Sequence, residues 1–376
     1  MRRTIGLITT FVLALQVASA HALPHLVVDL TNDRVLEAKE AFHPWHPASL
    51  TKMMTAYTVF RAIERGRFDP KTPIKMTWWA AQQSPSKMFY RPGTLIPLED
   101  ALTMLMVKSA NDVSMAIAET VGGSTEGFAA MMNESAAELG MTSSYFVNPH
   151  GLHHPRQITT ARDMALLVRA LAKYPDWKHL FTTSRISYRN SKGKMSELRS
   201  FNTLLERFAG TDGMKTGYVC PSGFNIAATA TRDGRRLLAI VFGRNSGIER
   251  ARHAAKLLQL GFENDTLPPE TATLDALKPG AAVPTTPRNM RQAVCETKNE
   301  PKVELQVLPA GIHGPPGPPR IWLAPRVKQV PRVVKTAGTA NPWPRLTKLE
   351  RIATPTPRPD PNEVRAALET AKPAQP

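Results

Sequence analysis

The sequence predicts an α/β fold of the α+β kind, in which one antiparallel sheet carries helices on both faces together with a mostly helical subdomain. Two observations predict this class. Stretches with the apolar alternation of β-strands are found near both ends of the globular part, and the middle carries apolar residues at helical spacing. Strands at both ends of a helical middle favour a single antiparallel sheet that is covered by helices.

The clearest predicted strands form two hairpins. A strand over 26–29 faces a partner over 34–36 across a polar Thr-Asn-Asp turn. Near the other end of the globular part, strands over 225–230 and 236–242 flank an Arg-Asp-Gly turn. The two hairpins supply strands from both ends of the globular part, as a single sheet requires.

Six segments carry apolar residues three and four positions apart, which is the spacing of one face of an α-helix. These predicted helices cover residues 49–64, 98–107, 112–120, 128–139, 161–172 and 248–260. Gly261 follows the last of them. Because glycine readily adopts the left-handed conformation that ends many helices, we expect Gly261 to be a C-cap.

The first 22 residues are predicted to be a secretory signal peptide rather than part of the fold. Arg2 and Arg3 supply a basic start, residues 5–17 are mostly apolar, and Ala18-Ser19-Ala20 provides the small residues that a signal peptidase requires. The alternative is an uncleaved anchor helix, but the apolar run is shorter than the roughly 20 residues that span a bilayer. We therefore expect an exported protein of the periplasm or cell envelope.

The chain is predicted to divide at about residue 265. Residues 24–265 carry periodic apolar patterns and few prolines, which indicates a globular domain. Residues 266–376 hold 21 of the 33 prolines, including the run PTPRPDP at 355–361. Because proline removes a hydrogen-bond donor and blocks regular ladders, we expect this basic tail to be largely disordered. Short apolar patches at 320–323 and 328–330 are candidates for small strands or docking motifs.

The formal net charge of +17 points to a polyanionic partner. Export argues against nucleic acid, so a cell-wall or lipid surface is the better expectation, with the basic tail as the segment that makes peripheral contact. Simple solubility at a high isoelectric point is the alternative, and charge alone does not separate the two.

The chain has only two cysteines, Cys220 and Cys295. A disulfide is compatible with an oxidising compartment. The two residues lie far apart in sequence, however, and Cys295 falls in the tail that we expect to be disordered. We therefore favour two unpaired thiols. Neither a CxxC pair nor the spacing of a zinc site is present.

The first candidate site motif is Ser49-Leu50-Thr51-Lys52. On a helix, residues three positions apart share a face, so the Ser49 hydroxyl and the Lys52 amine are expected to meet at the head of the helix. A serine needs a base to become a nucleophile, and a buried lysine with a lowered pKa is such a base. The alternative is a helix-capping serine followed by a surface lysine.

The second motif is Ser109-Ala110-Asn111, between two predicted helices. In an extended backbone, residues two apart face the same side, so a hydroxyl and a carboxamide are expected to line one wall of a cleft. Ser109 is then suited to relay a proton, and Asn111 to hold a peptide bond. The alternative is a helix cap, since both residue types favour helix starts.

The third motif is Lys215-Thr216-Gly217, which follows a turn signal at Asp212-Gly213 and lies in a predicted strand. Lys215 and Thr216 offer a positive charge and a hydroxyl to a carboxylate, and Gly217 leaves room for a ligand to approach the backbone. The alternative is an ordinary edge strand that a lysine protects from pairing.

Taken together and in this order, 60 and 106 residues apart, the three motifs form a specific set. The chain resembles the serine D-Ala-D-Ala carboxypeptidases, which are low-molecular-mass penicillin-binding proteins with a β-lactamase-like fold. The resemblance covers about 24–265 and includes the strings PASLTKMMTAY, MLMVKSANDVSMAIAE, FVNPHGL and DGMKTGY. It implies that 24–265 is the catalytic domain.

The resemblance implies a role for each motif. Ser49 is expected to attack the carbonyl between the last two D-alanines of a peptidoglycan stem peptide, and Lys52 to accept the serine proton. Ser109 is expected to pass a proton to the leaving amine, with Lys215 tuning that step. Asn111 is expected to hold the acyl side chain.

Further roles concern the binding of charge. Thr216 is expected to bind the terminal carboxylate, and the backbone N–H groups of Ser49 and Tyr218 to form the oxyanion hole. Arg250 matches a carboxylate-binding arginine near the start of the last helix, with Arg252 and Arg244 as rivals.

Two nearby residues stand apart from this scheme. We expect His150 to be a structural turn histidine without a catalytic role. Cys220, close after the third motif, departs from the family pattern.

The implied partners are a stem peptide that ends in D-Ala-D-Ala and β-lactams as covalent inhibitors. No metal or organic cofactor is implied. Three alternatives stay open: a D,D-endopeptidase that cuts cross-links, a class A-like β-lactamase, and a non-catalytic wall-binding protein. The β-lactamase reading is the weaker enzyme alternative because residues 141–156 contain no glutamate to activate a deacylating water.

Overall fold

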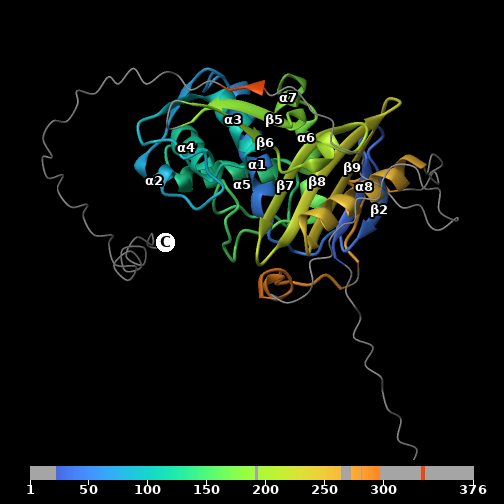
Figure 1. Cartoon of the computed structure of the whole chain (residues 1–376). Coiled ribbons are helices and arrows are strands. Elements are labelled where there is room, and N and C mark those ends of the chain that lie inside the picture. The colour runs from blue at the N-terminus through green and yellow to red at the C-terminus, as the bar shows by residue number, and fades with distance from the viewer. Residues whose placement is uncertain (1–22, 191–193, 264–271, 281, 297–331, 335–376) are drawn as a thin grey trace, which may run out of the picture. The chain divides into compact units, whose positions relative to one another are not determined.

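A computed structural model describes residues 23–190, 194–263, 272–280, 282–296 and 332–334 (Figure 1). The predicted signal peptide over 1–22 lies outside the described residues. Within the described residues, no helix is both long enough and apolar enough to cross a membrane.

The central element is a five-stranded antiparallel sheet of order β2-β1-β9-β8-β7. Its strands are β1 (His25–Asp29), β2 (Arg34–Lys39), β7 (Thr211–Val219), β8 (Gly223–Arg232) and β9 (Arg235–Arg244). The two predicted hairpins are present, and β1 pairs with β9, which joins the two ends of the globular part. β7 forms one edge of this sheet, and that edge faces the site described below.

The helices agree with the predicted periodic segments. They are α1 (Thr51–Glu64), α3 (Leu98–Val107), α4 (Asn111–Gly122), α5 (Thr125–Glu138), α6 (Ala161–Leu171) and α8 (Gly247–Glu263). Two short helices, α2 (Trp78–Ala81) and α7 (Lys178–Thr182), add to them. The 3₁₀ turns are η1 (Ala48–Leu50), η2 (Pro175–Trp177) and η3 (Thr203–Glu206).

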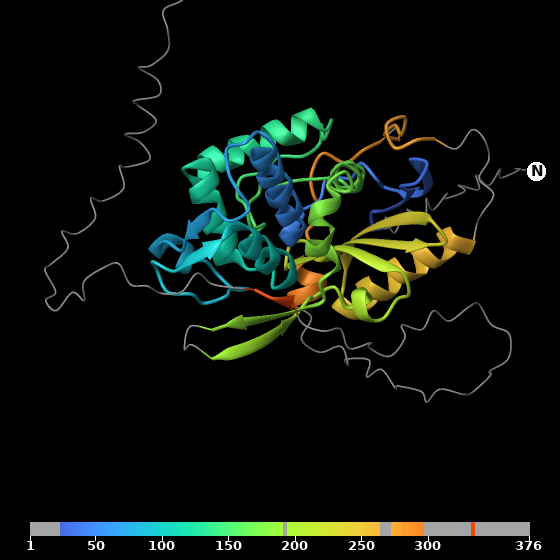
Figure 2. The same ribbon diagram turned by 90° about the horizontal axis from the view of Figure 1, so that it is seen from above.

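Both faces of the sheet are covered, and the alternation of each strand explains how. Side chains of successive strand residues point to opposite faces. Leu26 and Val28 therefore pack in the core that includes α1 and α6, whereas Val27 packs in the separate core against α8. Figure 2 shows the blue and green helices gathered away from the yellow-orange α8. The predicted α+β class is confirmed.

The expectation for Gly261 is wrong. This glycine lies inside α8, which continues to Glu263. A Cβ atom at this position would lie 2.8 Å from Leu237 Cδ1 and 3.1 Å from Leu36 Cδ1. A side chain here would push against Leu237 and Leu36, so the glycine suits the close packing of α8 on the sheet rather than the end of the helix.

Two smaller sheets complete the described fold. β3 (Pro73–Lys75) pairs with β4 (Leu95–Pro97) beside the α-helical part. β5 (Arg185–Arg189) pairs with β6 (Met195–Arg199), and β10 (Arg332–Val333) adds to β5 in parallel. β10 is the one strand that the described part of the tail contributes, just beyond the patch predicted at 328–330.

Part of the predicted tail is ordered against the domain, which differs from expectation. Leu274 and Met290 are buried, and the short π-helix η4 (Gln292–Glu296) carries Cys295. Cys220 and Cys295 form a disulfide, so the expectation of two unpaired thiols is wrong. The described tail contacts β2 through the bridge between Thr273 and Arg34, and Met290 N donates to Pro221 O in the loop after β7, which brings Cys295 to Cys220. Residues 297–331 and 335–376, for which disorder is predicted, lie outside the described residues.

Candidate active site

Ser49 lies in η1, directly before α1, and is half-buried. Lys52 follows one turn later, in the first turn of α1. The Nζ atom of Lys52 lies 3.0 Å from the Oγ atom of Ser49. The structure thus brings the two side chains of the first motif together, as the spacing of three residues on a helix requires.

The amine of Lys52 is completely buried and has three oxygen neighbours. Besides Ser49 Oγ, it donates to Asn111 Oδ1 at 2.7 Å and to the backbone carbonyl of His150 at 2.5 Å. Burial, reinforced by the charge of Lys215 and opposed by Asp112, holds the pKa of Lys52 well below its ordinary value. This amine is therefore suited to lose its proton and act as a base.

The second motif occupies the junction between α3 and α4. Ser109 is buried and has a left-handed φ of 59°, a conformation that residues with a side chain rarely adopt. Asn111 begins α4, where its Nδ2 donates to Ser84 O at 2.8 Å and its backbone N to Ser86 O at 2.7 Å. These bonds to the 84–86 loop turn the Asn111 carbonyl oxygen toward Lys52.

The loop before α3 fixes this junction from a second direction. The backbone bond from Asn111 N to Ser86 O is matched by a bond from Ser86 Oγ to Lys108 O at 2.9 Å. Asp112 accepts backbone N–H groups of Met88 and Phe89, and its burial raises the pKa of its carboxyl. The loop and the start of α4 are therefore held together around the second motif.

The third motif lies on the edge strand β7, pressed against η1. A Cβ atom at Gly217 would lie 2.9 Å from Pro47 O and 2.9 Å from Ser49 N, so only glycine allows this approach. Thr216 is buried, whereas Tyr218 is 41% exposed. The structure therefore brings the third motif beside the first, with the backbone of Gly217 next to that of Ser49.

Lys215 and Arg250 form a pair of buried cations at this edge. Burial, reinforced by the charge of Arg250, lowers the pKa of Lys215 to about 7. Burial lowers the pKa of Arg250 to about 10, and its Nη2 donates to Phe201 O at 3.3 Å. Two positive charges held out of water in this way favour the binding of an anion between them.

The two rival arginines are placed differently. Arg244 lies 3.7 Å from the carboxylate of Glu249 and 3.1 Å from His253 Nε2, and Arg252 is exposed on α8. Arg250 is the one of the three whose charge acts on Lys215. The geometry thus groups Arg250, and neither rival, with the third motif.

The string Asn148-Pro149-His150-Gly151 packs under η1 and α1. Gly151 has a φ of 82°, and a Cβ atom there would collide with Ala48 O. Both the left-handed backbone conformation and the close contact therefore require glycine. Thr55 and Ser114 donate to Pro149 O at 2.6 and 2.7 Å. Burial and the charge of Lys52 lower the pKa of His150 to about 3, so its ring is neutral.

Sequence reasoning missed the part that His150 plays. Its ring takes no part in the cluster, but its backbone carbonyl accepts a hydrogen bond from Lys52. The signal for this contact is the glycine that follows, which lets the loop approach η1. Among the described residues, no group of three or more His, Cys, Asp or Glu side chains is placed to hold a metal ion.

Comparison with known proteins agrees with this geometry. The family described as D-alanyl-D-alanine carboxypeptidase matches residues 11–246. D-alanyl-D-alanine carboxypeptidase DacF of Bacillus subtilis is 31% identical over 63% of this chain and 61% of its own length. The matched region thus spans about three fifths of that relative.

Solved structures extend the comparison to the fold. Penicillin binding protein 6B from Escherichia coli is 33% identical, with a TM-score of 0.60 over 65% of this chain and 78% of its own. Penicillin-Binding Protein D2 from Listeria monocytogenes, solved with ampicillin bound, is 26% identical, with a TM-score of 0.55 over 64% of this chain and 97% of its own. With the family match covering more than half of its residues, this chain belongs to the D-alanyl-D-alanine carboxypeptidase family.

Proposed function

We propose that this chain is a serine D-Ala-D-Ala carboxypeptidase, which removes the terminal D-alanine from peptidoglycan stem peptides through an acyl-enzyme on Ser49. The observation that carries the proposal is the contact between the buried Lys52 amine and the Ser49 hydroxyl. A neutral amine has two N–H groups and one lone pair. With its N–H groups directed to Asn111 and His150, the lone pair is left for the proton of Ser49.

Acylation follows from this arrangement. Ser49 Oγ bonds to the carbonyl carbon between the two D-alanines as its proton passes to Lys52. The backbone N–H groups of Ser49 and Tyr218 stabilise the negative charge on the carbonyl oxygen. When the amide bond breaks, the leaving amine takes a proton that Ser109 relays from Lys52, which leaves Lys52 neutral again, and Lys215 supports that transfer by its charge.

Binding of the substrate uses the edge of the sheet. The terminal carboxylate is bound by the hydroxyl of Thr216 and by the charges of Lys215 and Arg250. Asn111 holds the acyl side of the peptide through its amide. Water then attacks the ester carbon of the acyl-enzyme, which frees the shortened peptide and restores the Ser49 hydroxyl.

β-Lactams are proposed as covalent inhibitors of the same serine. The D2 protein of Listeria monocytogenes, which shares the fold, was solved with ampicillin bound. A β-lactam carries a strained amide and a carboxylate, and we propose that Ser49 attacks the amide while Thr216 binds the carboxylate. Opening of the lactam by Ser49 leaves the ester on the serine and the amine on the same molecule, so no leaving group departs.

The proposed location is the cell envelope, where the substrate is found. The apolar run and small residues before residue 22 support export, and the basic residues of 266–376 support contact with an anionic wall or membrane surface. Binding of the chain to isolated walls and anionic vesicles, with and without residues 297–376, tests this contact. Equal binding of both forms would refute it.

Mass spectrometry after penicillin treatment tests the central proposal. The expected result is one adduct, on the peptide that contains Ser49, with none on a Ser49→Ala variant. In parallel, incubation with a monomeric pentapeptide should release free D-alanine. A cross-linked dimer that is cut in preference to the pentapeptide would instead support the endopeptidase alternative.

A further inference from the structure

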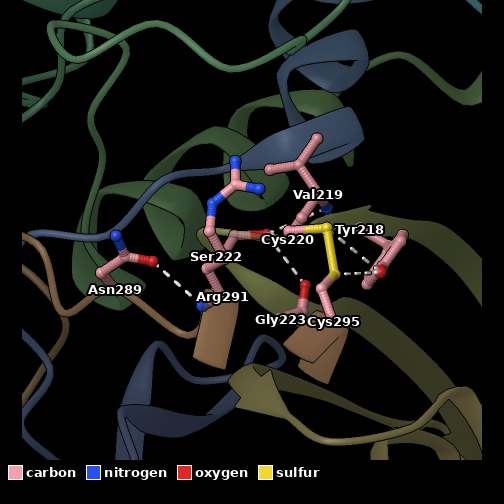
Figure 3. Close-up of a disulfide and its surroundings, with 8 residues drawn as sticks. All are labelled: Tyr218, Val219, Cys220, Ser222, Gly223, Asn289, Arg291 and Cys295. Atoms are coloured by element: carbon pink, nitrogen blue, oxygen red, sulfur yellow. Dashed lines mark hydrogen bonds between the residues drawn. A yellow bond between two sulfur atoms is a disulfide. The ribbon is translucent and has the colours of Figure 1, made fainter. Parts of the chain in front are cut away.

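The segment 288–296 lies beyond the region that matches the family, yet it is fixed to the end of β7. Cys295 is joined to Cys220 by the disulfide, and Met290 N donates to Pro221 O at 3.0 Å. The hydroxyl of Tyr218 lies 3.0 Å from Cys295 Sγ (Figure 3). Three contacts, two of them through Cys295, therefore attach this segment to the residues that follow Gly217.

The direction of a bound peptide brings it toward this segment. This step rests on the proposed function. The carboxylate-binding groups lie at Lys215 and Thr216, and the nucleophile lies beside Gly217. If the terminal carboxylate of a peptide lies at Lys215 and Thr216 and its scissile bond lies beside Gly217, the rest of the peptide must continue along Tyr218 toward Cys220.

The rise per residue of an extended peptide indicates which substrate residue lies beside the segment 288–296. A β-strand rises about 3.3 Å per residue, so substrate residues advance along β7 roughly one for one. The D-alanine that is acylated lies level with Tyr218. The residue before it in the peptide then lies level with Val219 and Cys220, where 288–296 is attached.

The segment carries two arginines, Arg288 and Arg291, and one carboxylate, Glu296. Arg291 is exposed and follows Met290 directly, and no carboxylate among the described residues is ion-paired with it. Besides burial, the charges of His46, Arg291 and His154 lower the pKa of His153, which places Arg291 near the 150–154 loop. The rings of His46 and His153 lie 4.6 Å apart. Arg291 thus lies near the loop that packs against η1.

We propose that the disulfide-bound segment 288–296 forms a wall of the cleft on the acyl side, where Arg291 binds a carboxylate on the side chain of the residue before D-Ala-D-Ala. An exposed guanidinium at this position favours a carboxylate over a neutral amide of the same shape. The disulfide supplies the anchoring, because η4 is a single short turn that does not hold its place by length alone. The segment thereby makes this chain selective among stem peptides.

Two synthetic N-acyl tripeptides ending in D-Ala-D-Ala test the proposal. They differ only in the first residue, whose side chain ends in a carboxylate in one and in a primary amide in the other. The expected ratio of their kcat/KM values is about fivefold in favour of the carboxylate, as for an exposed ion pair, and it should fall with added salt. Arg291→Gln should bring the ratio close to one.

Matched variants separate this effect from a general loss of charge or order. Arg252→Gln removes an exposed arginine from α8 and should keep the fivefold ratio. A double variant, Cys220→Ser with Cys295→Ser, should lose the ratio while it still folds by circular dichroism. An equal rate with both peptides in the unmodified chain, or a ratio that survives Arg291→Gln, would overturn the proposal.

Penicillin labelling separates a failure of this inference from a failure of the proposed function. The label should form on Ser49 in the unmodified chain and in the Arg291→Gln variant at similar rates. If the chain takes the label and cuts both peptides equally, the inference alone is refuted. If the chain takes no label and cuts neither peptide, the proposed function is refuted, and the inference with it.

Discussion

Gly217 lies so close to Ser49 that a Cβ atom on the glycine would be 2.9 Å from the serine backbone nitrogen. This approach joins two parts of the chain that lie far apart in sequence, the edge strand β7 and the turn η1. It places the backbone of the third motif beside the proposed nucleophile. The geometry of the candidate active site therefore depends on the absence of one methyl group.

Gly217→Ala should slow acylation without unfolding the chain. The added methyl group must push β7 away from η1, and a displacement of about 1 Å in a reacting site lowers the rate about 10²-fold. The second-order rate of penicillin labelling measures the effect. Gly280→Ala is the matched control, because a Cβ atom there meets nothing within 4 Å. A labelling rate unchanged by Gly217→Ala would contradict the role given to this contact.

Lys52→Arg should lower the rate of acylation about 10³-fold, because a guanidinium does not lose its proton and so cannot act as the base. Stopped-flow labelling with a fluorescent penicillin measures the rate. Lys256→Arg, on the exposed side of α8, is the control and should leave the rate unchanged. Rapid labelling of the Lys52→Arg variant would show that another group takes the Ser49 proton.

The dependence of kcat/KM on pH should be bell-shaped. Activity should rise with pH as Lys52 loses its proton, from a pKa well below the ordinary lysine value. It should fall again above a pKa of about 7, as Lys215 loses the charge that binds the substrate carboxylate. Lys215→Arg keeps that charge at high pH, so its basic limb should move upward. An unmoved basic limb in this variant would assign that limb to a different group.

Much of this site is predictable from the sequence because its side chains lie in short strings. Ser49 and Lys52 are three residues apart on one helix, so local periodicity places that pair. Lys215 and Thr216 are adjacent on one strand, where successive side chains point to opposite faces, so periodicity alone does not bring them to one site. Their convergence follows from the family resemblance. The contribution of the His150 carbonyl is not predictable in this way, since every residue has a backbone carbonyl and only the loop conformation selects this one.

The misses in the fold have related causes. Gly261 lies in a helix because α8 packs closely on Leu237, a tertiary contact that overrides the local preference of glycine for a helix end. The hairpin of β5 and β6 has arginines at both ends and weak apolar alternation, so the pattern does not indicate strands. The pairing of Cys220 with Cys295 depends on the path of 272–296, which carries no periodic signal.

The neutral His150 ring should make the chain less stable in mild acid. Its pKa is lowered from about 6.5 to about 3, so the unfolded chain binds a proton between these values that the folded chain excludes. Stability from this group is complete above the unfolded pKa and is lost progressively as pH falls from about 6.5 toward 3. Urea unfolding from pH 7 to pH 4 measures the loss, and a His150→Asn variant should show a shallower decline. Equal slopes for both proteins would exclude this source.

The disulfide should stabilise the whole described domain. It joins residues 75 apart in sequence, and a closed loop of that size limits the freedom of the unfolded chain. Reduction, or the double change Cys220→Ser with Cys295→Ser, should lower the free energy of unfolding by about 2–4 kcal/mol. Urea unfolding with and without reductant measures this, and the double variant is the control, since reductant should not change it. If reductant lowers the stability of the double variant by a similar amount, the loss of stability does not come from the disulfide. If reductant changes the stability of neither protein, residues 272–296 are held by their buried apolar side chains, such as Leu274 and Met290, rather than by the disulfide.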